Sequence, residues 1–334
     1  MVDRQWHIDS IISQWGVPSY LKVSGFLHLG KQERVSRLKK FTTSHSWSFE
    51  DKRLAIFKPY YNLTMIQLKH TGRLVVGAII ALTSIASVTA DCTREGLLAS
   101  AATYIAAQTS GSLTSLSLST TNFTYQENNK VTDIKKGVLS TPLKIDLNRS
   151  SADTVACASY TLLISSTGSK PYVLATQIRH PGNDSSTIAM IDTIAATTGS
   201  LFFNAAKTLG YEQKEDWGTL APANQSSRAL LKAVGDAYLD MWTNTTAADT
   251  IPWGTDCERV EGSSLTKPCG ASLPHGGSTT LNSMRRYVID ETVGSVDVLC
   301  AFNSLGDYPD SHQIRLEAGK VKLEKNLVGK ENVV

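Results

Sequence analysis

The sequence predicts an α+β protein built from two tandem units behind an N-terminal leader. An amphipathic helix pattern followed by strand patterns occurs twice, once near residue 94 and again near residue 228. Matched residues also recur in the same order in the two halves, which indicates an internal repeat. An uncharged apolar run of signal-peptide length precedes the first half.

Residues 65–90 have the three parts of a secretory signal peptide. A basic front precedes an uncharged apolar run, and Val88 and Ala90 supply the small residues of a cleavage site. The run is shorter than the roughly 20 residues that cross a bilayer, which favours cleavage and secretion over a retained membrane anchor. We interpret residues 1–64 as a gene-model extension or a disordered segment. In a membrane-anchored form they would be a cytoplasmic tail.

The charge of the chain divides at the end of this leader. The whole sequence carries 33 Lys and Arg against 30 Asp and Glu, a net charge of +3. Residues 1–90 hold 12 basic and 5 acidic side chains, so the remainder has a net charge of about −4. No stripe of Lys and Arg occurs after the leader, and we expect no nucleic-acid partner.

All five cysteines follow the leader, as an oxidising compartment favours. Cys257 and Cys269 flank a loop and are the first choice for a disulfide, with Cys92 and Cys157 the second. Cys300 then remains as a buried free thiol within an apolar run, and the alternative is a nucleophile.

Five N-x-S/T sequons in the same region also agree with secretion. We expect glycans at Asn122, Asn148, Asn183, Asn224 and Asn244.

The first expected unit covers residues 91–208. Residues 94–108 have helical spacing, with Asp91 or Thr93 as the N-cap and Gly111 as the stop. Strand patterns follow at 121–127, at 155–165 with 172–179 as a hairpin, and at 187–199 with 200–208 as a second hairpin.

A linker at 209–227 leads to the second unit, residues 228–325, and a tail at 326–334. The second unit opens with a helix pattern at 228–242. An offset of 134 pairs Arg94 with Arg228, Tyr104 with Tyr238 and Glu127 with Glu261, and Gln177-Ile178-Arg179 later pairs with Gln313-Ile314-Arg315.

In each half, the helix containing a tyrosine and the strand ending in Glu-Asn or Glu-Gly resemble SnoaL-like members of the nuclear-transport-factor-2-like superfamily. The runs at 251–262, 285–298 and 309–321 resemble a family of fungal secreted proteins with an uncharacterised domain. The resemblance implies two cone-shaped units, each a curved, mostly antiparallel sheet packed on helices around a pocket. After Val321 the sequence departs from the apolar closing strand that the family implies.

Candidate catalytic residues lie in the second half. Glu261, like Glu127, comes at the end of a strand, where burial would raise its pKa and make it a general acid or base. The alternative is that each glutamate bonds a backbone N–H or an arginine to fix a turn. Asp310 and His312 are two apart on a strand and share a face, so the aspartate can orient the histidine as a base. The alternative for His312 is a surface residue at a strand end.

Other side chains can line the pocket. Arg259 and Arg286 can bind an anionic group, although salt bridging is their alternative use. Trp253 and Tyr238 can contact a ligand, although core packing is the alternative for the tryptophan. Phosphate-binding, dinucleotide-binding, hydrolase and zinc-protease motifs are absent, and the histidines are widely spaced, so we expect no cofactor and no metal.

These observations lead to two hypotheses. The first is a secreted glycoprotein that binds a small, largely apolar molecule and performs cofactor-free isomerisation, cyclisation or dehydration. The second is a non-catalytic secreted binding or effector-like protein. The sequence leaves the oligomeric state and the ligand open, and the first hypothesis depends on analogy at the level of the fold.

Overall fold

The computed structural model describes residues 92–182 and 184–330. The expected signal peptide and the segment before it lie outside these residues. Within them, the chain forms two six-stranded sheets and a small number of helices, so the predicted mixed α+β class with two sheet units is confirmed.

The two main helices begin at the arginines that the repeat pairs. α2 (Arg94–Ser110) is capped by Thr93, whose hydroxyl accepts from Gly96 N at 3.1 Å, and ends at Gly111 with a φ of 68°. α4 (Arg228–Asp240) starts in the same way, with a serine cap. Both predicted helices are therefore confirmed, and of the two candidate caps for α2 the structure selects Thr93.

The two sheets have the same strand order. The first, β2-β1-β6-β5-β4-β3, consists of β1 (Thr124–Glu127), β2 (Lys130–Val131), β3 (Leu147–Asp153), β4 (Ala158–Ser165), β5 (Tyr172–Arg179) and β6 (Met190–Thr197). The second, β8-β7-β12-β11-β10-β9, consists of β7 (Trp253–Glu261), β8 (Ser264–Thr266), β9 (Ser283–Asp290), β10 (Ser295–Phe302), β11 (Tyr308–Glu317) and β12 (Lys320–Val328). In each sheet one central pair is parallel, β1 with β6 and β7 with β12, and the other neighbours are antiparallel.

One predicted hairpin is wrong in its second arm. The sequence predicts a strand at 200–208, but this segment leads into α3 (Ala205–Glu212), which Asn204 caps by accepting from Lys207 N. β6 already has β5 on one side and β1 on the other, so it has no free edge for a hairpin partner.

The remaining elements are three short 3₁₀ helices and the C-terminal end of β12. The single-turn 3₁₀ helices are η1 (Val138–Ser140), η2 (Pro222–Asn224) and η3 (Ala248–Thr250). β12 continues through Val328, past the unit boundary expected at residue 325, so the expected tail begins inside a strand.

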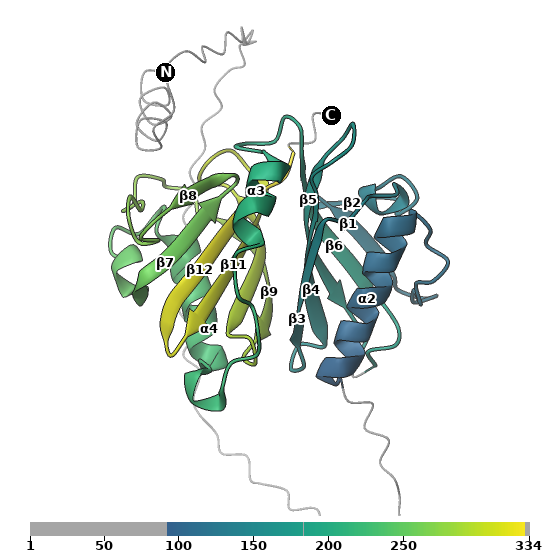
Figure 1. Ribbon diagram of the computed structural model, residues 1–334, viewed down its shortest axis with the longest axis horizontal. Helices are drawn as coiled ribbons and strands as arrows, with labels where there is room; N and C mark the ends of the chain where they lie inside the picture. Colours follow the sequence, from purple (N-terminus) through teal and green to yellow (C-terminus); the bar gives the residue numbers. More distant parts are fainter. Residues whose placement is uncertain (1–91, 183, 331–334) are drawn as a thin grey trace, which may run out of the picture. The chain divides into compact units, whose positions relative to one another are not determined.

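The elements form four layers, helix, sheet, sheet, helix (Figure 1). α2 and its sheet enclose one apolar core, and α4 and the second sheet enclose another. A third core fills the space between the two sheets, where residues such as Ile164 and Ile194 meet Leu299. Each sheet therefore has one face toward its own helix and one face toward the other sheet.

Contacts between the two halves are reciprocal. Arg94 of α2 forms an ion pair with Asp290 at the end of β9, and Arg228 of α4 forms one with Asp153 at the end of β3, at 2.7 Å. The peptide N–H just before each aspartate donates to the other aspartate, at 2.8 and 2.9 Å. Such exchange of equivalent contacts is the property of a twofold interface, so the halves are related by a pseudo-twofold axis.

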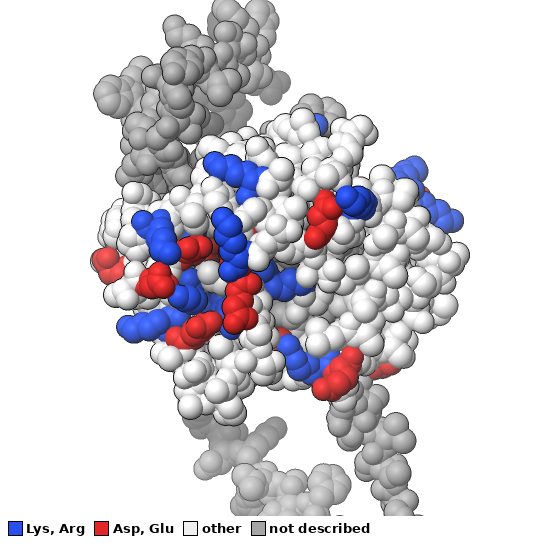
Figure 2. Space-filling model, viewed as in Figure 1, with Lys and Arg blue, Asp and Glu red and all other residues white. Residues whose placement is uncertain are grey.

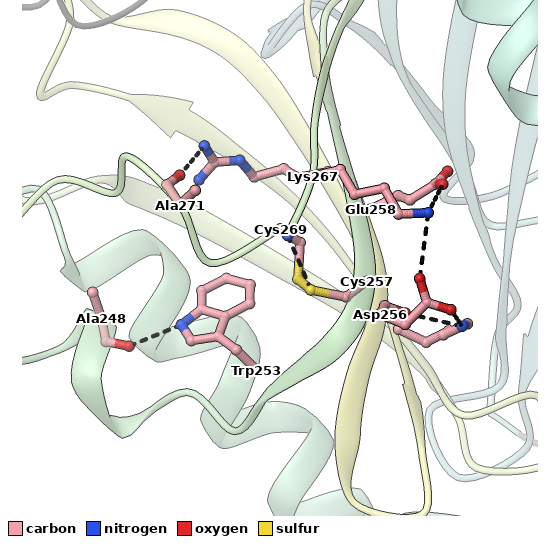
Figure 3. Close-up of a disulfide and its surroundings, with 10 residues drawn as sticks. Ala248, Trp253, Asp256, Cys257, Glu258, Lys267, Cys269 and Ala271 are labelled. Carbon is pink, nitrogen blue, oxygen red and sulfur yellow. Dashed lines mark hydrogen bonds and ion pairs between the residues drawn. A yellow bond between two sulfur atoms is a disulfide. The ribbon is translucent and has the colours of Figure 1, made fainter.

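Both predicted cysteine pairs are close enough to be disulfides. Cys92 pairs with Cys157, which holds the start of α2 against the β3–β4 turn, and Cys257 pairs with Cys269 (Figure 3). Cys300 is buried and lies outside both pairs.

The sequon asparagines that the structure describes are all exposed, as a glycan requires: Asn122, Asn148, Asn224 and Asn244. Asn183 lies outside the described residues, and glycosylation itself stays a prediction. No helix among residues 92–182 and 184–330 is both long and apolar enough to cross a membrane.

Surface charges of the two signs are mixed. On the face drawn in Figure 2, Lys and Arg lie beside Asp and Glu over the half that carries β7 and β12, and the half that carries α2 shows few charges. That face has no broad stripe of one sign of the kind that nucleic-acid binding requires.

Candidate functional site

The predicted catalytic residues meet on the helix-facing side of the second sheet. Side chains alternate along a strand, so residues two apart share a face. Neighbouring strands bring together seven side chains beneath Tyr238 of α4, and we call these the polar cluster: Arg259 and Glu261 from β7, Glu324 and Asn326 from β12, Asp310 and His312 from β11, and Cys300 from β10.

Glu261 lies in the interior and is held from two sides. The Tyr238 hydroxyl donates to its Oε1 at 3.1 Å, and Arg259 Nε lies 3.3 Å from its Oε2. Burial raises the pKa of Glu261 to about 8, the positive charge of Arg259 opposes this rise, and the negative charge of Glu324 adds to it. Glu261 is therefore a carboxylic acid that keeps its proton near neutral pH.

His312 lies between two carboxylates. Its Nε2 is 2.9 Å from Asp310 Oδ2, its Nδ1 is 3.3 Å from Glu324 Oε1, and its ring centroid is 4.9 Å from that of Tyr238. Burial alone would lower the pKa of His312, but the charge of Asp310 and the surrounding hydrogen bonds outweigh it and raise the pKa well above its usual value. The prediction that Asp310 and His312 share a face is thus confirmed, and the alternative of a surface histidine is wrong.

This geometry changes the role that we predicted for His312. A histidine with a raised pKa carries its proton at neutral pH, so it donates hydrogen bonds and cannot accept a proton. With His312 and Arg259 positive, Asp310 and Glu324 negative and Glu261 protonated, the charges within the polar cluster sum to zero. Charge balance of this kind makes burial of so many ionisable groups tolerable.

The first unit has different residues at the equivalent positions. We define equivalent positions by strand register. Residues that are opposite one another on neighbouring strands among β1, β4, β5 and β6 correspond to residues that are opposite one another in the second sheet. Five members of the polar cluster have these counterparts in the first unit: Leu163 for Cys300, Leu174 for Asp310, Thr176 for His312, Ile191 for Glu324 and Thr193 for Asn326. The second unit therefore places ionisable groups where the first has aliphatic and hydroxyl side chains.

Glu127, the counterpart of Glu261, has a structural role. Its Oε2 accepts from the Tyr125 hydroxyl and from the backbone N–H of Val138, both at 2.7 Å, which fixes the start of η1. Tyr104, the counterpart of Tyr238, instead bonds Thr176 at 2.7 Å. For Glu127 the turn-fixing alternative is therefore the one that the contacts support.

The remaining predicted ligand-binding residues divide between two places. Arg286 lies on the other face of the sheet, where its Nε bonds Asp192 of the first unit at 2.6 Å, so it is apart from the polar cluster. Arg259 reaches past Glu261 and donates to Ala271 O at 2.8 Å. Trp253 donates to Ala248 O (Figure 3). Its ring also packs edge-on against Tyr238, with ring centroids 6.3 Å apart.

Sequence reasoning missed three members of the polar cluster. Glu324 and Asn326 were given no role because both follow Val321, where the resemblance of the sequence ends, although they alternate in a strand pattern. Cys300 has no histidine nearby in the sequence, yet it is directly opposite Asp310 in the sheet, and the atoms of Cys300, Asp310 and His312 that can bind a metal all lie within 4.8 Å. Spacing along the chain did not reveal this group, because its members come from adjacent antiparallel strands.

Of two cavities in the described part of the chain, one reaches the polar cluster only at Asn326 and the other does not reach it. One between the sheets has room for about 20 Å³, the size of a single water, and is lined by residues such as Tyr160, Glu212 and Lys325. A shallow groove of about 300 Å³ runs between α2 and residues 115–117, and its lining is mostly Ser and Thr. The side chains of the polar cluster are themselves buried, except that of Asn326, which is half-buried.

Comparison with known proteins gives one partial match. Residues 224–325 match a domain of unknown function (DUF8021), a range that includes every member of the polar cluster except Asn326. No curated protein matches the chain, and no solved structure matches it.

Proposed function

We propose that the second unit is an acid–base site for a small, largely apolar molecule, carried by a secreted glycoprotein. The reaction class is a cofactor-independent isomerisation, cyclisation or dehydration, in which one buried group gives a proton and another takes one. The SnoaL-like resemblance of the sequence agrees with this class by analogy alone.

The observation that carries the proposal is the difference between the two units. Replacing a buried ion cluster by apolar residues of similar volume is often neutral or stabilising, so stability alone does not explain why one unit has such a cluster. The first unit forms a sheet of the same strand order with Leu, Ile and Thr at the positions equivalent to the polar cluster. Buried ionisable groups with shifted pKa values are concentrated at functional sites.

Each group in the proposed site has a distinct role. Glu261 is the proton donor because it is protonated at neutral pH. Glu324 is the proton acceptor, since its Oε2 is buried and has no hydrogen-bond partner. His312 carries a buried positive charge that stabilises negative charge developing on the substrate, and Asp310 keeps it charged and oriented.

A ligand reaches this site past the loop between β8 and β9. The disulfide ties this loop to β7 (Figure 3), and Ala271 within it accepts the hydrogen bond from Arg259. Gly270 lies on the Trp253 ring so closely that a Cβ would be 3.0 Å from the ring. Residues 270–282 would have to move away from Trp253 for a ligand to reach Tyr238 and Glu261 by this route.

The second candidate is the non-catalytic binding or effector-like protein. The closed packing of the polar cluster beneath α4 favours it, since a protein whose interior is filled by side chains acts through its surface. The two candidates differ in whether Glu261 matters for anything besides folding.

A pair of matched variants tests the proposal. Glu261→Gln removes the proton donor, and Glu127→Gln makes the same change at the equivalent position of the first unit. Both are expressed in the natural producer, and the medium is assayed for secreted protein and for its small-molecule products. We expect Glu261→Gln to be secreted normally but to lose a product that the wild type and Glu127→Gln both make. Unchanged products with normal secretion of Glu261→Gln would leave the non-catalytic candidate.

Export is tested separately by identifying the N-terminal peptide of protein recovered from the medium. A chain that starts at Asp91 and loses mass on enzymatic deglycosylation supports a secreted glycoprotein, whereas a chain retained in cell membranes contradicts it.

A further inference from the structure

Cys300, Asp310 and His312 form a compact group of potential metal ligands inside the second unit. Their metal-binding atoms, a thiol sulfur, a carboxylate oxygen and an imidazole nitrogen, all lie within 4.8 Å of one another, and all three residues are buried. A zinc ion bonded at about 2.0 to 2.3 Å would hold such atoms roughly 3.2 to 3.8 Å apart, so only small side-chain movements are needed to close on a metal.

The surrounding residues orient these ligands as the outer shell of a metal site does. Glu324 Oε1 lies 3.3 Å from His312 Nδ1, which fixes the ring so that Nε2 faces Asp310. Asp310 Oδ1 accepts from Asn326 Nδ2 at 2.7 Å and from Ser311 N at 2.9 Å, which leaves Oδ2 directed at His312. A carboxylate behind a ligating histidine is the usual device for setting its tautomer and basicity.

Two of the converging atoms lack a well-formed hydrogen bond. His312 Nε2 and Asp310 Oδ2 are only 2.9 Å apart, yet neither has a hydrogen-bond partner of good geometry. The Asp310 side chain is fully buried, and that of His312 is 3% exposed. Buried polar atoms of this kind call for an unseen ion or water.

The first unit again serves as a comparison, because its equivalents of Cys300, Asp310 and His312 are Leu163, Leu174 and Thr176. Leucine side chains cannot bind a metal, so the fold itself does not require ligands at these positions. Cys300 is also the one described cysteine without a disulfide partner, in a chain whose other cysteines are paired.

We propose that Cys300, Asp310 and His312 bind a divalent transition metal of the zinc class. Thiolate and imidazole ligands together select zinc over magnesium or calcium, which prefer oxygen. Three protein ligands leave a fourth position open, the arrangement found in catalytic rather than structural zinc sites. The metal replaces the protons of His312 and the Cys300 thiol, so binding releases protons.

This inference goes beyond the acid–base proposal and does not require it. With a metal bound, His312 would ligate it through Nε2 and keep its Nδ1 contact with Glu324, and Glu261 would keep its role as the proton donor. Cys300 has no part in the acid–base proposal, so its replacement separates the two ideas.

The test measures metal bound by the full chain. Wild-type protein and the variants Cys300→Ser, Glu324→Gln and Glu261→Gln are equilibrated with excess ZnCl₂ or CoCl₂, freed of unbound metal by gel filtration and assayed by elemental mass spectrometry. Absorption spectra of the cobalt forms report thiolate ligation through a near-ultraviolet charge-transfer band. Circular dichroism and thermal unfolding check that each variant folds.

We expect about one metal per wild-type chain, with a thiolate band in the cobalt form. Cys300→Ser should lose the band and most of the metal, and Glu324→Gln should bind about 10- to 100-fold more weakly, as for other outer-shell changes. Glu261→Gln should bind as the wild type does. Wild-type protein that retains no metal, or equal metal in wild type and Cys300→Ser, would overturn the inference. If Cys300→Ser does not fold, a wild-type cobalt spectrum without the thiolate band overturns it equally.

Discussion

Asp297 gives the protein a pH-dependent stability that one substitution should remove. This aspartate is on β10, on the face toward the first sheet, and is fully buried. Its Oδ2 accepts from Ser151 of the first unit at 2.6 Å and from Ser295 at 3.1 Å, and its Oδ1 has no hydrogen-bond partner. Burial raises the pKa of Asp297 to about 7, even though these serine hydrogen bonds oppose the rise.

The sign and size of the effect follow from linkage. The unfolded chain ionises Asp297 near the ordinary aspartate pKa of 3.8, whereas the folded protein keeps the proton up to about pH 7. Stability is therefore fully present below pH 4 and is lost as the pH rises to 7, with a slope of up to about 1.4 kcal/mol per pH unit. Over about three units the loss reaches about 4 kcal/mol, which is a large part of the stability of a typical domain.

Asp297→Asn keeps the size of the side chain and removes its titration. The free energy of unfolding, from urea titrations at pH 4 to 8, should differ little between variant and wild type at pH 4. The variant should then become the more stable protein by an amount that grows to about 4 kcal/mol at pH 7 and levels off above it. Asp249→Asn, at an exposed aspartate of η3, controls for removal of a carboxylate charge.

A difference between Asp297→Asn and wild type that does not change with pH would refute this reasoning, because the substitution removes the titration of Asp297 itself. A variant that loses stability at every pH would show instead that the carboxylate is ionised when buried.

Other predictions concern the same unfolding measurements. Glu261, whose folded pKa of about 8 is also raised by burial, should reduce stability as the pH rises from about 4.5 to 8, and Glu261→Gln should remove that trend. Replacing both Cys257 and Cys269 by alanine should cost about 3 kcal/mol on the chain-entropy model, and reductant should then have less effect on the variant than on the wild type. Asp153→Ala leaves Arg228 without its ion-pair partner and should lower the free energy of unfolding by about 2 to 3 kcal/mol. A double-mutant cycle that replaces Asp153 and Arg228 singly and together should show a coupling energy well above that of a surface ion pair.

Local patterns in the sequence were enough to predict much of the fold. The helix at residues 94–108 was readable because its spacing, its cap and its glycine stop all agree, and the strands at 155–165 and 172–179 because β-branched and apolar residues fill them. The strand prediction for 200–208 was wrong because β1, from an earlier part of the chain, pairs with the edge of β6 that this segment would have used. A local sequence pattern does not reveal a strand pairing of this kind.

The candidate site shows the same division. Asp310 and His312 were found because two residues apart on one strand is a local relation, whereas Cys300 and Glu324 join them only through strand pairing. Arg286 was misassigned to the pocket for the related reason that the face of β9 on which it lies meets the other unit. The packing of the two sheets against each other was not predicted, although it determines which faces of both sheets are available for a site.

The difference between the two units can be tested directly by transplanting residues from one to the other. Five substitutions give the second unit the helix-facing residues of the first, Cys300→Leu, Asp310→Leu, His312→Thr, Glu324→Ile and Asn326→Thr. They remove the negative charge of Glu324 that raises the pKa of Glu261, so Glu261 can ionise beside Arg259 as a balanced ion pair. They also allow the Tyr238 hydroxyl to bond the new threonines, as Tyr104 does with Thr176 at 2.7 Å. If the polar cluster serves function, urea unfolding should show unchanged or higher stability, by up to about 4 kcal/mol, because buried charges are often replaced by apolar residues at no loss. A large loss of stability in a correctly secreted protein would mean that the polar cluster specifies the fold, and the argument from buried charge to function would then fail.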